Sequence, residues 1–341
     1  MSVAGTTATN AVENSAVEQA AGSLLSRYME LTKARLSALV LFTAAVGYVM
    51  AAPSPVDWIR FIWVIIGVGL SAGAANAFNQ VIEAHRDARM QRTRNRPVPS
   101  GRLSARHGFF AALAMAYVGV LSLALFVNVI AAALSLLTIV IYVLLYTPLK
   151  VRTTLNTWIG AICGALPPMI GWVAARGQLD AGAWVLGALL FVWQLPHFLA
   201  LAWLYRADYE RGGYRMLPSA DPSGQLTGKV CVYTSLILLP TTLSAAMVGL
   251  TGWLFAIGAI GLGIWMLRLA LRFARQRDET TARQAFIGSI VYLPLVLAAM
   301  LGDRAIFETA PNMIGDSAAV AAEFENHLQT SAASDASYRN E

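Results

Sequence analysis

The feature that most restricts the fold of this chain is a series of apolar runs, each about 20 residues long, that recurs along most of its 341 residues. An α-helix of that length crosses about 30 Å of hydrocarbon. Hydrophobic residues make up 57% of the chain and charged residues only 13%, about half the usual share in a soluble domain. The sequence therefore predicts an all-α integral membrane protein.

Nine transmembrane helices are predicted, joined by short polar loops. Their approximate limits are 36–53, 58–82, 107–127, 129–147, 154–175, 182–204, 228–251, 253–271 and 284–302. The third and fourth runs are separated only by the stretch VNVI at 127–130. Because these two runs together are too long for one crossing, two helices are expected there.

Basic residues gather in alternate loops. Seven arginines lie between Arg86 and Arg106, on the same predicted side as most other cations, whereas the opposite side holds little more than Arg60, Arg176 and Arg304. Lysine and arginine stay on the cytoplasmic side of a membrane. The N-terminus is therefore predicted to be cytoplasmic and the C-terminus periplasmic. The absence of lysine and arginine from residues 1–22 argues against a signal or transit peptide, so the simplest location is a bacterial inner membrane.

Composition divides the chain into three regions. Residues 1–24 are predicted to be a disordered cytoplasmic segment, 25–302 the membrane domain, and 303–341 an acidic tail that is disordered by composition. Cys163 and Cys231 lie in separate apolar runs and offer neither a disulfide framework nor a thiolate metal site. Membrane orientation accounts for the net charge of +6, so no nucleic-acid partner is expected.

The second apolar run ends in a polar stripe. Asn76, Asn79, Gln80, Glu83 and Asp87 are spaced three and four residues apart, which places them on one helical face. Polar residues inside a span are unfavourable and usually line a cavity. Glu83 and Asp87 are one turn apart, about 6 Å along the helix axis, and repel each other unless a cation lies between them. Mg²⁺ binds carboxylates while keeping positions for phosphate, so the stripe favours a Mg²⁺–diphosphate site.

Two basic clusters accompany the predicted metal site. Arg92, Arg94 and Arg96 directly follow the stripe, and their forked donors suit phosphate oxygens. Each is also explained as an ordinary cytoplasmic charge, and both interpretations stay open. The stretch WLYRADYERGGYRMLP at 203–218 supplies Asp208 among further arginines on the same predicted side. Alone it is typical of a solvated loop, but the pairing of two such clusters favours one shared site.

These residues carry a resemblance to a known family. Asn79, Glu83 and Asp87 fall on the N-D-x-x-D-x-x-x-D motif of the UbiA-type intramembrane prenyltransferases, which the chain resembles over roughly residues 25–302. Gln80 and Glu83 stand where that family usually has Asp, although both keep an oxygen donor. The strings DARMQRTRNRPVPSG, WQLPHF and GGYRMLP are similar to the haem-specific branch of the family.

The resemblance implies a fold and an activity. It implies helices around a central cavity that opens to the cytoplasmic side, where a farnesyl group passes from farnesyl diphosphate to a vinyl group of haem b, with water addition, to give haem O. Mg²⁺ is the implied cofactor. The implied partners are haem b, farnesyl diphosphate and the lipid bilayer, and a downstream haem-modifying enzyme or oxidase assembly is left open.

The resemblance also implies roles for individual residues. Catalytic roles fall on Asn79, Glu83, Asp87 and Asp208, with the three carboxylates Glu83, Asp87 and Asp208 as metal ligands. Substrate-binding roles fall on Arg92, Arg96, Lys150, Arg206, Tyr146, Asn156 and His197. His197 is implied to place the haem, because neutral imidazole is a common iron ligand. A lone histidine in a span also occurs as a structural hydrogen-bonding residue, and that alternative stays open.

Two rival functions remain. A UbiA-type prenyltransferase with another aromatic or tetrapyrrole acceptor would keep the same polar stripe, and product analysis with haem b distinguishes it. A membrane transporter would place charges near the middle of the bilayer or contain paired broken helices. The charges of this chain gather instead at one predicted face, which favours the enzyme.

Overall fold

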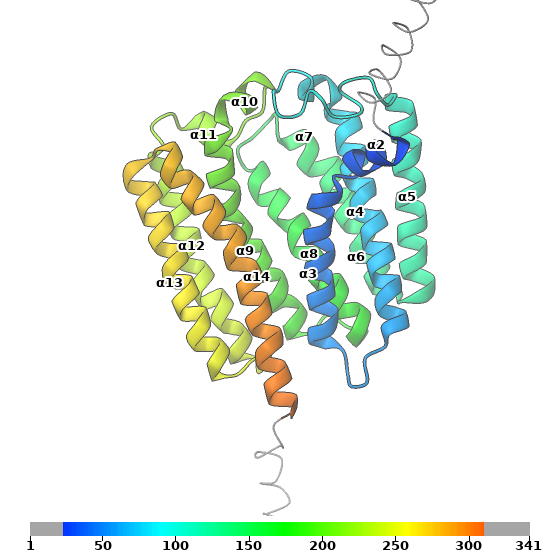
Figure 1. The fold of residues 1–341 in the computed structure, drawn as a ribbon, viewed down its shortest axis with the longest axis vertical. Coiled ribbons are helices and arrows are strands. Elements are labelled where there is room, and N and C mark those ends of the chain that lie inside the picture. The colour runs from blue at the N-terminus through cyan, green and yellow to red at the C-terminus, as the bar shows by residue number, and fades with distance from the viewer. Residues whose placement is uncertain (1–22, 310–341) are drawn as a thin grey trace, which may run out of the picture.

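The computed structural model describes residues 23–309, with side chains as far as residue 306. Of the segments predicted to be disordered, 1–24 and 303–341, residues 1–22 and 310–341 lie outside the described residues. In chain order the elements are α2 (Leu24–Leu31), α3 (Ala34–Ala51), α4 (Trp58–Asp87), α5 (Ala105–Phe126), α6 (Val129–Val140), the π-helical turn η1 (Ile141–Tyr146), α7 (Thr147–Leu149), α8 (Asn156–Arg176), α9 (Ala181–Leu204), α10 (Arg206–Arg211), α11 (Leu217–Ala220), α12 (Gln225–Met247), α13 (Trp253–Gln276) and α14 (Glu279–Thr309) (Figure 1).

Nine helical segments within residues 23–309 are long and apolar enough to cross a membrane. This confirms the predicted all-α membrane fold and the predicted number of spans. The limits are Ala34–Ala51, Trp58–Asp87, Ala105–Phe126, Val129–Leu149, Asn156–Arg176, Ala181–Leu204, Gln225–Met247, Trp253–Gln276 and Glu279–Ile306. The second span ends at Asp87 rather than at residue 82, so the whole polar stripe is helical.

Asn128 separates the third and fourth spans, as the length of the two runs predicted. Its backbone is extended, and its side-chain oxygen accepts a hydrogen bond from the backbone N–H of Ala131 at 2.8 Å, which caps α6. Its side-chain amide donates to the carbonyl of Val173 in α8 at 3.0 Å. Asn128 therefore lies in the turn between α5 and α6, caps the start of α6 and joins the turn to α8.

The helices α8 and α9 form the interior of the bundle. The buried share of the α8 span is 72% and that of α9 is 61%, against 22% for α5 and 22% for the α6 span. Figure 1 shows α4, α5 and α6 on one side of the bundle and α12 and α13 on the other. The outer helices therefore present apolar side chains to lipid, whereas α8 and α9 supply side chains to the interior.

Close packing of α3 against α8 depends on glycine. A Cβ added to Gly47 would stand 2.1 Å from the carbonyl oxygen of Pro168, and one added to Gly171 would stand 1.9 Å from that of Ala44. Small residues allow this approach of two backbones within a membrane. Pro167 and Pro168 lie inside α8, and the helix runs unbroken through both while packed against α3.

The last helix runs further than predicted. Residues 303–309 belong to α14 rather than to the acidic tail. Asp303 is buried, and its carboxylate accepts hydrogen bonds from the backbone N–H groups of Gly252 and Phe255, which caps the start of α13. Arg304 donates to the carbonyl of Ala52 at 2.6 Å. These contacts hold the end of α14 against two neighbouring loops.

The short helices and the longest loops gather at one end of the bundle. Figure 1 shows α2, α7, α10 and α11 at its upper end, where α4 also ends, while α14 ends at the opposite side. The polar stripe of α4 therefore points into the end of the bundle that carries the arginine loop, the name used here for residues 88–96. Because the described part has an odd number of crossings, α3 begins at one end of the bundle and α14 ends at the other (Figure 1).

Candidate active site

A cavity of about 390 Å³ lies between α3, α4, η1, α8 and α9 and the loops above them. Nine of the eleven residues assigned to the site from the sequence line it: Asn79, Glu83, Asp87, Arg92, Arg96, Tyr146, Lys150, Asn156 and His197. Asp208 and Arg206 do not line it. The predicted opening of a central cavity to the cytoplasm stays a prediction from the distribution of basic residues.

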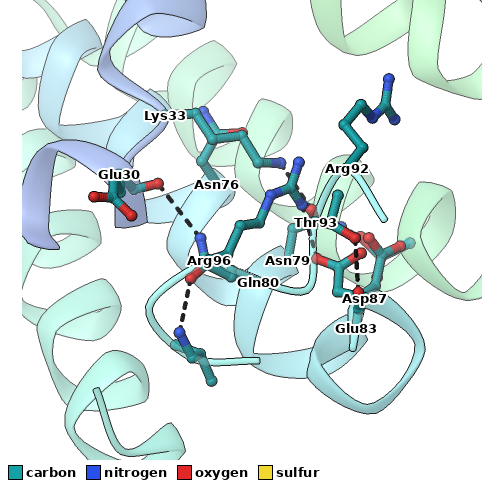
Figure 2. Close-up of polar contacts among 12 residues, drawn as sticks. Glu30, Lys33, Asn76, Asn79, Gln80, Glu83, Asp87, Arg92, Thr93 and Arg96 are labelled. Carbon is teal, nitrogen blue, oxygen red and sulfur yellow. Dashed lines mark hydrogen bonds and ion pairs between the residues drawn. The ribbon is translucent and has the colours of Figure 1, made fainter. Parts of the chain in front are cut away.

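The stripe of α4 supplies the acidic wall of this cavity. Asn79, Glu83 and Asp87 are 0%, 4% and 2% exposed. Figure 2 shows them along one face of the helix, with Arg96 and Lys33 reaching toward them. Two buried carboxylates one helical turn apart require compensating positive charge, because each raises the energy of the other. The surrounding side chains provide that charge.

Three cations contact the polar stripe. Lys150 Nζ lies 2.9 Å from Glu83 Oε1 and 3.1 Å from its Oε2. Arg96 donates to Asp87 Oδ2 at 2.7 Å. Lys33 donates to Asn79 Oδ1 at 3.0 Å (Figure 2). Positive and negative groups therefore alternate along the wall of the cavity.

Burial and the neighbouring charges shift the pKa values of Lys33 and Lys150 in opposite directions. Burial lowers the pKa of Lys33, and the positive charges of Arg96 and Lys150 lower it further, to about 7. Burial acts in the same direction on Lys150, but the adjacent carboxylate of Glu83 outweighs it and raises the pKa of Lys150. Lys150 therefore stays positively charged beside Glu83, as Arg96 does beside Asp87.

The π-helical turn η1 supplies an aromatic wall. Tyr146 lies beneath Lys150, whose Nζ is 4.5 Å from the ring centroid. A Cβ added to Gly160 of α8 would stand 2.8 Å from this ring, so the glycine leaves room for the tyrosine. A π-turn carries one residue more than an α-helical turn, and such turns are frequent at functional sites. Here the turn directs Tyr142 and Tyr146 to the same cavity.

Asp208 lies outside this cavity and holds the arginine loop in place. Its Oδ1 accepts hydrogen bonds from the backbone N–H of Gln91 at 2.8 Å and from Arg211 at 2.6 Å, and its Oδ2 accepts from the backbone N–H of Arg92 at 3.2 Å. It lines a separate hollow beside Tyr205. Burial alone would raise the pKa of Asp208, but the hydrogen bonds from Arg211, Gln91 and Arg92 lower it.

The loop held by Asp208 carries a cation into the cavity. The guanidinium of Arg92 packs on the ring of Tyr205 at 4.6 Å and donates to the hydroxyl of Tyr209 at 3.0 Å. Arg92 lines both the cavity and the hollow of Asp208. The second acidic cluster therefore meets the first through the backbone of the loop, and its carboxylate does not reach the cavity.

Two other assigned residues have different surroundings from those expected. Arg206 is exposed and packs on Trp203 at 4.6 Å, away from the cavity. Asn156 is the first residue of α8 and is fully buried. Its side-chain amide donates to the carbonyls of Thr153 and Arg215 at 2.6 Å and 2.8 Å, which joins the loop before α8 to the segment after α10.

Gln80 is a structural residue rather than an oxygen donor for a metal. Its Oε1 accepts from the backbone N–H of Val98 at 3.1 Å, and its amide donates to the carbonyl of Glu30 at 3.4 Å (Figure 2). It is fully buried, and it does not line the cavity. Gln80 and Glu83 were both expected to offer an oxygen donor, and of the two only Glu83 lines the cavity.

His197 is one of three α9 residues that line the cavity, together with Phe198 and Leu201. Its Nδ1 lies 2.8 Å from Ser289 Oγ of α14. The rings of Trp193 and Phe286 pack against it with centroid distances of 5.1 Å and 4.9 Å. The ring is therefore held on one edge by a hydroxyl and on its faces by aromatic groups.

The donors at the cavity suit Mg²⁺ with a phosphate ligand. No group of three or more His, Cys, Asp or Glu side chains within residues 23–309 forms a metal site by itself. Mg²⁺ is commonly bound through one or two carboxylates, with substrate phosphates and water completing its shell. Glu83 and Asp87 meet that requirement, and Glu83 Oε1 is buried without a hydrogen bond of good geometry. The predicted set of three carboxylates is not brought together.

Several cavity residues were not predicted as site residues. Lys33, Tyr142, Tyr209 and Tyr214 line it. Burial, together with the charges of Glu83 and Asp87, raises the pKa of Tyr214. Lys33 looked in the sequence like an ordinary cytoplasmic charge. Only its left-handed backbone (φ 50°), which begins α3, turns it toward the stripe.

Comparison with known proteins gives one consistent result. Residues 40–293 match the model of the UbiA prenyltransferase family. The chain is 41% identical over 286 residues to a protoheme IX farnesyltransferase from Solibacter usitatus (strain Ellin6076), covering 81% of this chain and 98% of that protein.

Solved structures share the fold. The apo structure of a UbiA homolog from Aeropyrum pernix K1 matches with a TM-score of 0.63 at 18% identity, covering 78% of this chain and 98% of that chain. A UbiA homolog from Archaeoglobus fulgidus bound to GPP and Mg²⁺ matches with a TM-score of 0.58 at 13% identity, covering 80% of this chain and 99% of that chain.

Proposed function

Because this chain belongs to the UbiA prenyltransferase family, we propose that it transfers a farnesyl group from farnesyl diphosphate to a vinyl group of haem b, with addition of water, to give haem O. The extent of its identity to a protoheme IX farnesyltransferase supports this acceptor. The single observation in the structure that carries the proposal is the pair of buried carboxylates, Glu83 and Asp87, alternating with cations in a cavity between membrane helices.

We assign metal binding to Asn79, Glu83 and Asp87. When bound there, Mg²⁺ supplies positive charge that lowers the energy of a departing diphosphate. A UbiA homolog from Archaeoglobus fulgidus was solved with Mg²⁺ and GPP, which supports divalent metal use in this fold. Asp208 is left out of this set, because its oxygens are occupied by the arginine loop.

The cations hold the diphosphate. Lys150 is a compact charge that already lies against Glu83, and Arg96 presents a forked donor beside Asp87. Arg92 approaches from the arginine loop. Positive groups that bind the leaving diphosphate more strongly as its charge grows favour the transition state over the bound substrate.

The remainder of the cavity keeps water away from the allylic cation. Tyr146, Phe198 and Leu201 contribute apolar and aromatic surface below the charged groups. A site from which water is excluded protects a reactive carbocation from early hydrolysis and strengthens the electrostatic contacts around it. We assign Tyr146 and Asn156 to shaping the substrate-binding wall and His197 to placing the haem.

The location of the protein follows from its fold and its charges. Nine apolar helices in the described residues make it a multi-pass membrane protein. We further propose a bacterial inner membrane with the basic loops in the cytoplasm, so that the cavity receives farnesyl diphosphate from that side. A downstream haem-modifying enzyme or oxidase assembly is the proposed recipient of the product.

The direct test is reconstitution. Purified protein is incubated with haem b, farnesyl diphosphate and Mg²⁺, and the porphyrin is identified by mass. We expect a product carrying one hydroxyethylfarnesyl group. Parallel reactions with an aromatic acceptor in place of haem b examine the rival activity. Prenylation of the aromatic acceptor alone would replace the proposed acceptor while leaving the chemistry of the cavity unchanged.

A further inference from the structure

Ser289 of α14 is a fully buried serine in an otherwise apolar segment, and it contacts two side chains of α9, Trp193 and His197. Its backbone carbonyl accepts a hydrogen bond from the indole N–H of Trp193 at 2.8 Å. Its hydroxyl lies 2.8 Å from His197 Nδ1. Trp193 and His197 are one helical turn apart, so a single residue of α14 positions both.

The hydrogen bonds of this serine determine which nitrogen of His197 carries the proton. Ser289 Oγ donates to the carbonyl oxygen of Phe286 at 2.6 Å. A hydroxyl has only one hydrogen, so toward His197 it offers a lone pair. With the hydroxyl hydrogen used in the bond to Phe286, Nδ1 is the donor to Ser289 Oγ, and in a neutral imidazole the opposite nitrogen, Nε2, is then unprotonated.

The ring is also fixed in orientation. Trp193 stacks on it with an interplanar angle of 23°, and Phe286 packs on it at 32°. Phe198 meets its edge with a centroid distance of 5.4 Å. His197 lines the cavity, and its one side-chain hydrogen bond to the described residues uses Nδ1. Nε2 is therefore a preoriented lone pair available to a molecule in the cavity.

The chemistry around His197 selects the kind of ligand. A free metal ion needs several protein donors, and no group of three or more His, Cys, Asp or Glu side chains that could hold one is found within residues 23–309. An iron porphyrin brings four nitrogen ligands of its own and needs one axial nitrogen from the protein. A single neutral imidazole whose other nitrogen is hydrogen-bonded is the usual arrangement for such a ligand.

We propose that Ser289 is a positioning residue that holds His197 as the Nδ1–H tautomer, so that Nε2 ligates the iron of the haem substrate. This rests on the proposed function, since it takes the acceptor to be an iron porphyrin. It adds the ligating atom and the residue that selects it. Ligation through Nε2 would anchor the centre of the porphyrin beside α9, and contacts at the porphyrin edge would then decide which vinyl group meets the farnesyl cation.

The test compares iron protoporphyrin IX with metal-free protoporphyrin IX. Both are titrated into full-length protein in detergent, with affinity measured by quenching of tryptophan fluorescence and ligation by the absorption spectrum of the iron form. The variants are Ser289→Ala, Ser289→Thr and His197→Gly. Ser235→Ala is the matched control, because it removes an equally buried serine hydroxyl from α12, away from the cavity.

We expect Ser289→Ala to weaken iron porphyrin binding by about 10- to 100-fold, the usual effect of removing a hydrogen-bond partner from a metal-binding histidine. Binding of the metal-free porphyrin should stay unchanged. Ser289→Thr, which keeps the hydroxyl, and Ser235→Ala should both behave as wild type. His197→Gly should lose the spectrum of the ligated iron, and added imidazole should restore it.

Each other outcome has a definite meaning. Equal iron affinity in wild type and Ser289→Ala overturns the role of the serine. An unchanged iron spectrum in His197→Gly overturns ligation by Nε2, and this arm decides the matter even if Ser289→Ala fails to fold. Binding of both porphyrins with no preference for iron overturns the inference and leaves the proposed function intact. Failure of wild type to bind either porphyrin refutes the proposed function itself.

Discussion

The substitution Asp208→Asn distinguishes two possible roles of this carboxylate, holding the arginine loop and binding metal. The native carboxylate accepts two backbone hydrogen bonds, from Gln91 and Arg92, and a side-chain bond from Arg211. A hydrogen bond to a charged group contributes about 1.5–3 kcal/mol. Asparagine keeps one acceptor oxygen and loses the charge, so we take the loss as one such bond. The side chain of Arg211 is 47% exposed, so its ion pair with Asp208 adds little.

That loss acts on substrate binding through the position of Arg92. When only a fraction of molecules has the loop closed, the apparent dissociation constant rises by the inverse of that fraction. Since 1.4 kcal/mol corresponds to a factor of ten, a loss of about 1.5–3 kcal/mol can raise the KM for farnesyl diphosphate by at most about 10- to 100-fold, and we expect an increase within that limit. The kcat and the Mg²⁺ concentration that gives half-maximal activity should stay near wild type, because the cavity carboxylates are untouched.

The assay is steady-state haem O formation at varied farnesyl diphosphate and varied Mg²⁺. Asp221→Asn is the matched control, since Asp221 also accepts a backbone hydrogen bond, from Thr227 at 2.8 Å, but lies away from the cavity. A large increase in the Mg²⁺ requirement of Asp208→Asn, with an unchanged KM for the diphosphate, would refute our account. That result would restore Asp208 as the metal ligand expected from the sequence.

The pH dependence of stability tests the hydrogen bonds of Asp208 independently. The hydrogen bonds of the folded protein lower the pKa of Asp208 below its unfolded value of about 4. The ionised carboxylate therefore contributes its full stability to the folded state at any pH above that value. This contribution is lost as the pH falls through the lowered value in the folded state. The difference in thermal stability between wild type and Asp208→Asn should therefore be full at neutral pH and narrow below about pH 4. A constant difference across that range would show that the carboxylate charge does not hold the loop.

Four further outcomes are expected. Asp87→Asn should reduce haem O formation by about 100-fold or more while the protein still inserts in the membrane, and near-normal turnover would contradict its role. Excess chelator should stop product formation and added Mg²⁺ should restore it, whereas activity that persists in chelator would exclude a divalent metal. Gly160→Ala places a methyl group 2.8 Å from the ring of Tyr146 and should raise the KM for farnesyl diphosphate about tenfold, and an unchanged KM would separate that ring from the substrate. Gly171→Ala places its Cβ 1.9 Å from a backbone oxygen of α3 and should destabilise the protein in detergent by about 1–3 kcal/mol. The control Gly258→Ala, where an added Cβ meets no atom within 4 Å, should melt as wild type, and equal melting of both variants would contradict the packing argument.

Sequence patterns predicted the part of the structure that depends on local regularity. Apolar length predicted the nine spans, and helical spacing placed Asn79, Glu83 and Asp87 on one face, where they do line the cavity. The same spacing also included Gln80, because a spacing of three and four residues shows that side chains share a helical face and does not show which of them reach the cavity. Gln80 turns to Val98 instead, a contact that spacing alone does not reveal.

Contacts between distant segments account for what was missed. Asp208 reaches the backbone of Gln91 across 117 positions of sequence, and its neighbouring arginines made it look like half of a metal site. Ser289 is one small polar residue in an apolar helix and carries no signal of its own. Its role appears only when α9 and α14 pack together and bring His197 to its hydroxyl.

The π-turn η1 uses one residue more than an α-helix would to cover the same length of span. Successive residues of an α-helix are rotated by about 100°, so an extra residue in regular winding would turn everything after it around the axis by that angle. The π-turn absorbs its extra residue locally, so a chain that lacks one residue within Ile141–Tyr146 would wind as an ordinary α-helix and still direct Lys150 toward Glu83. Among related chains, a gap of one residue in these six positions should therefore change the aromatic wall and leave the cation that compensates Glu83 in place.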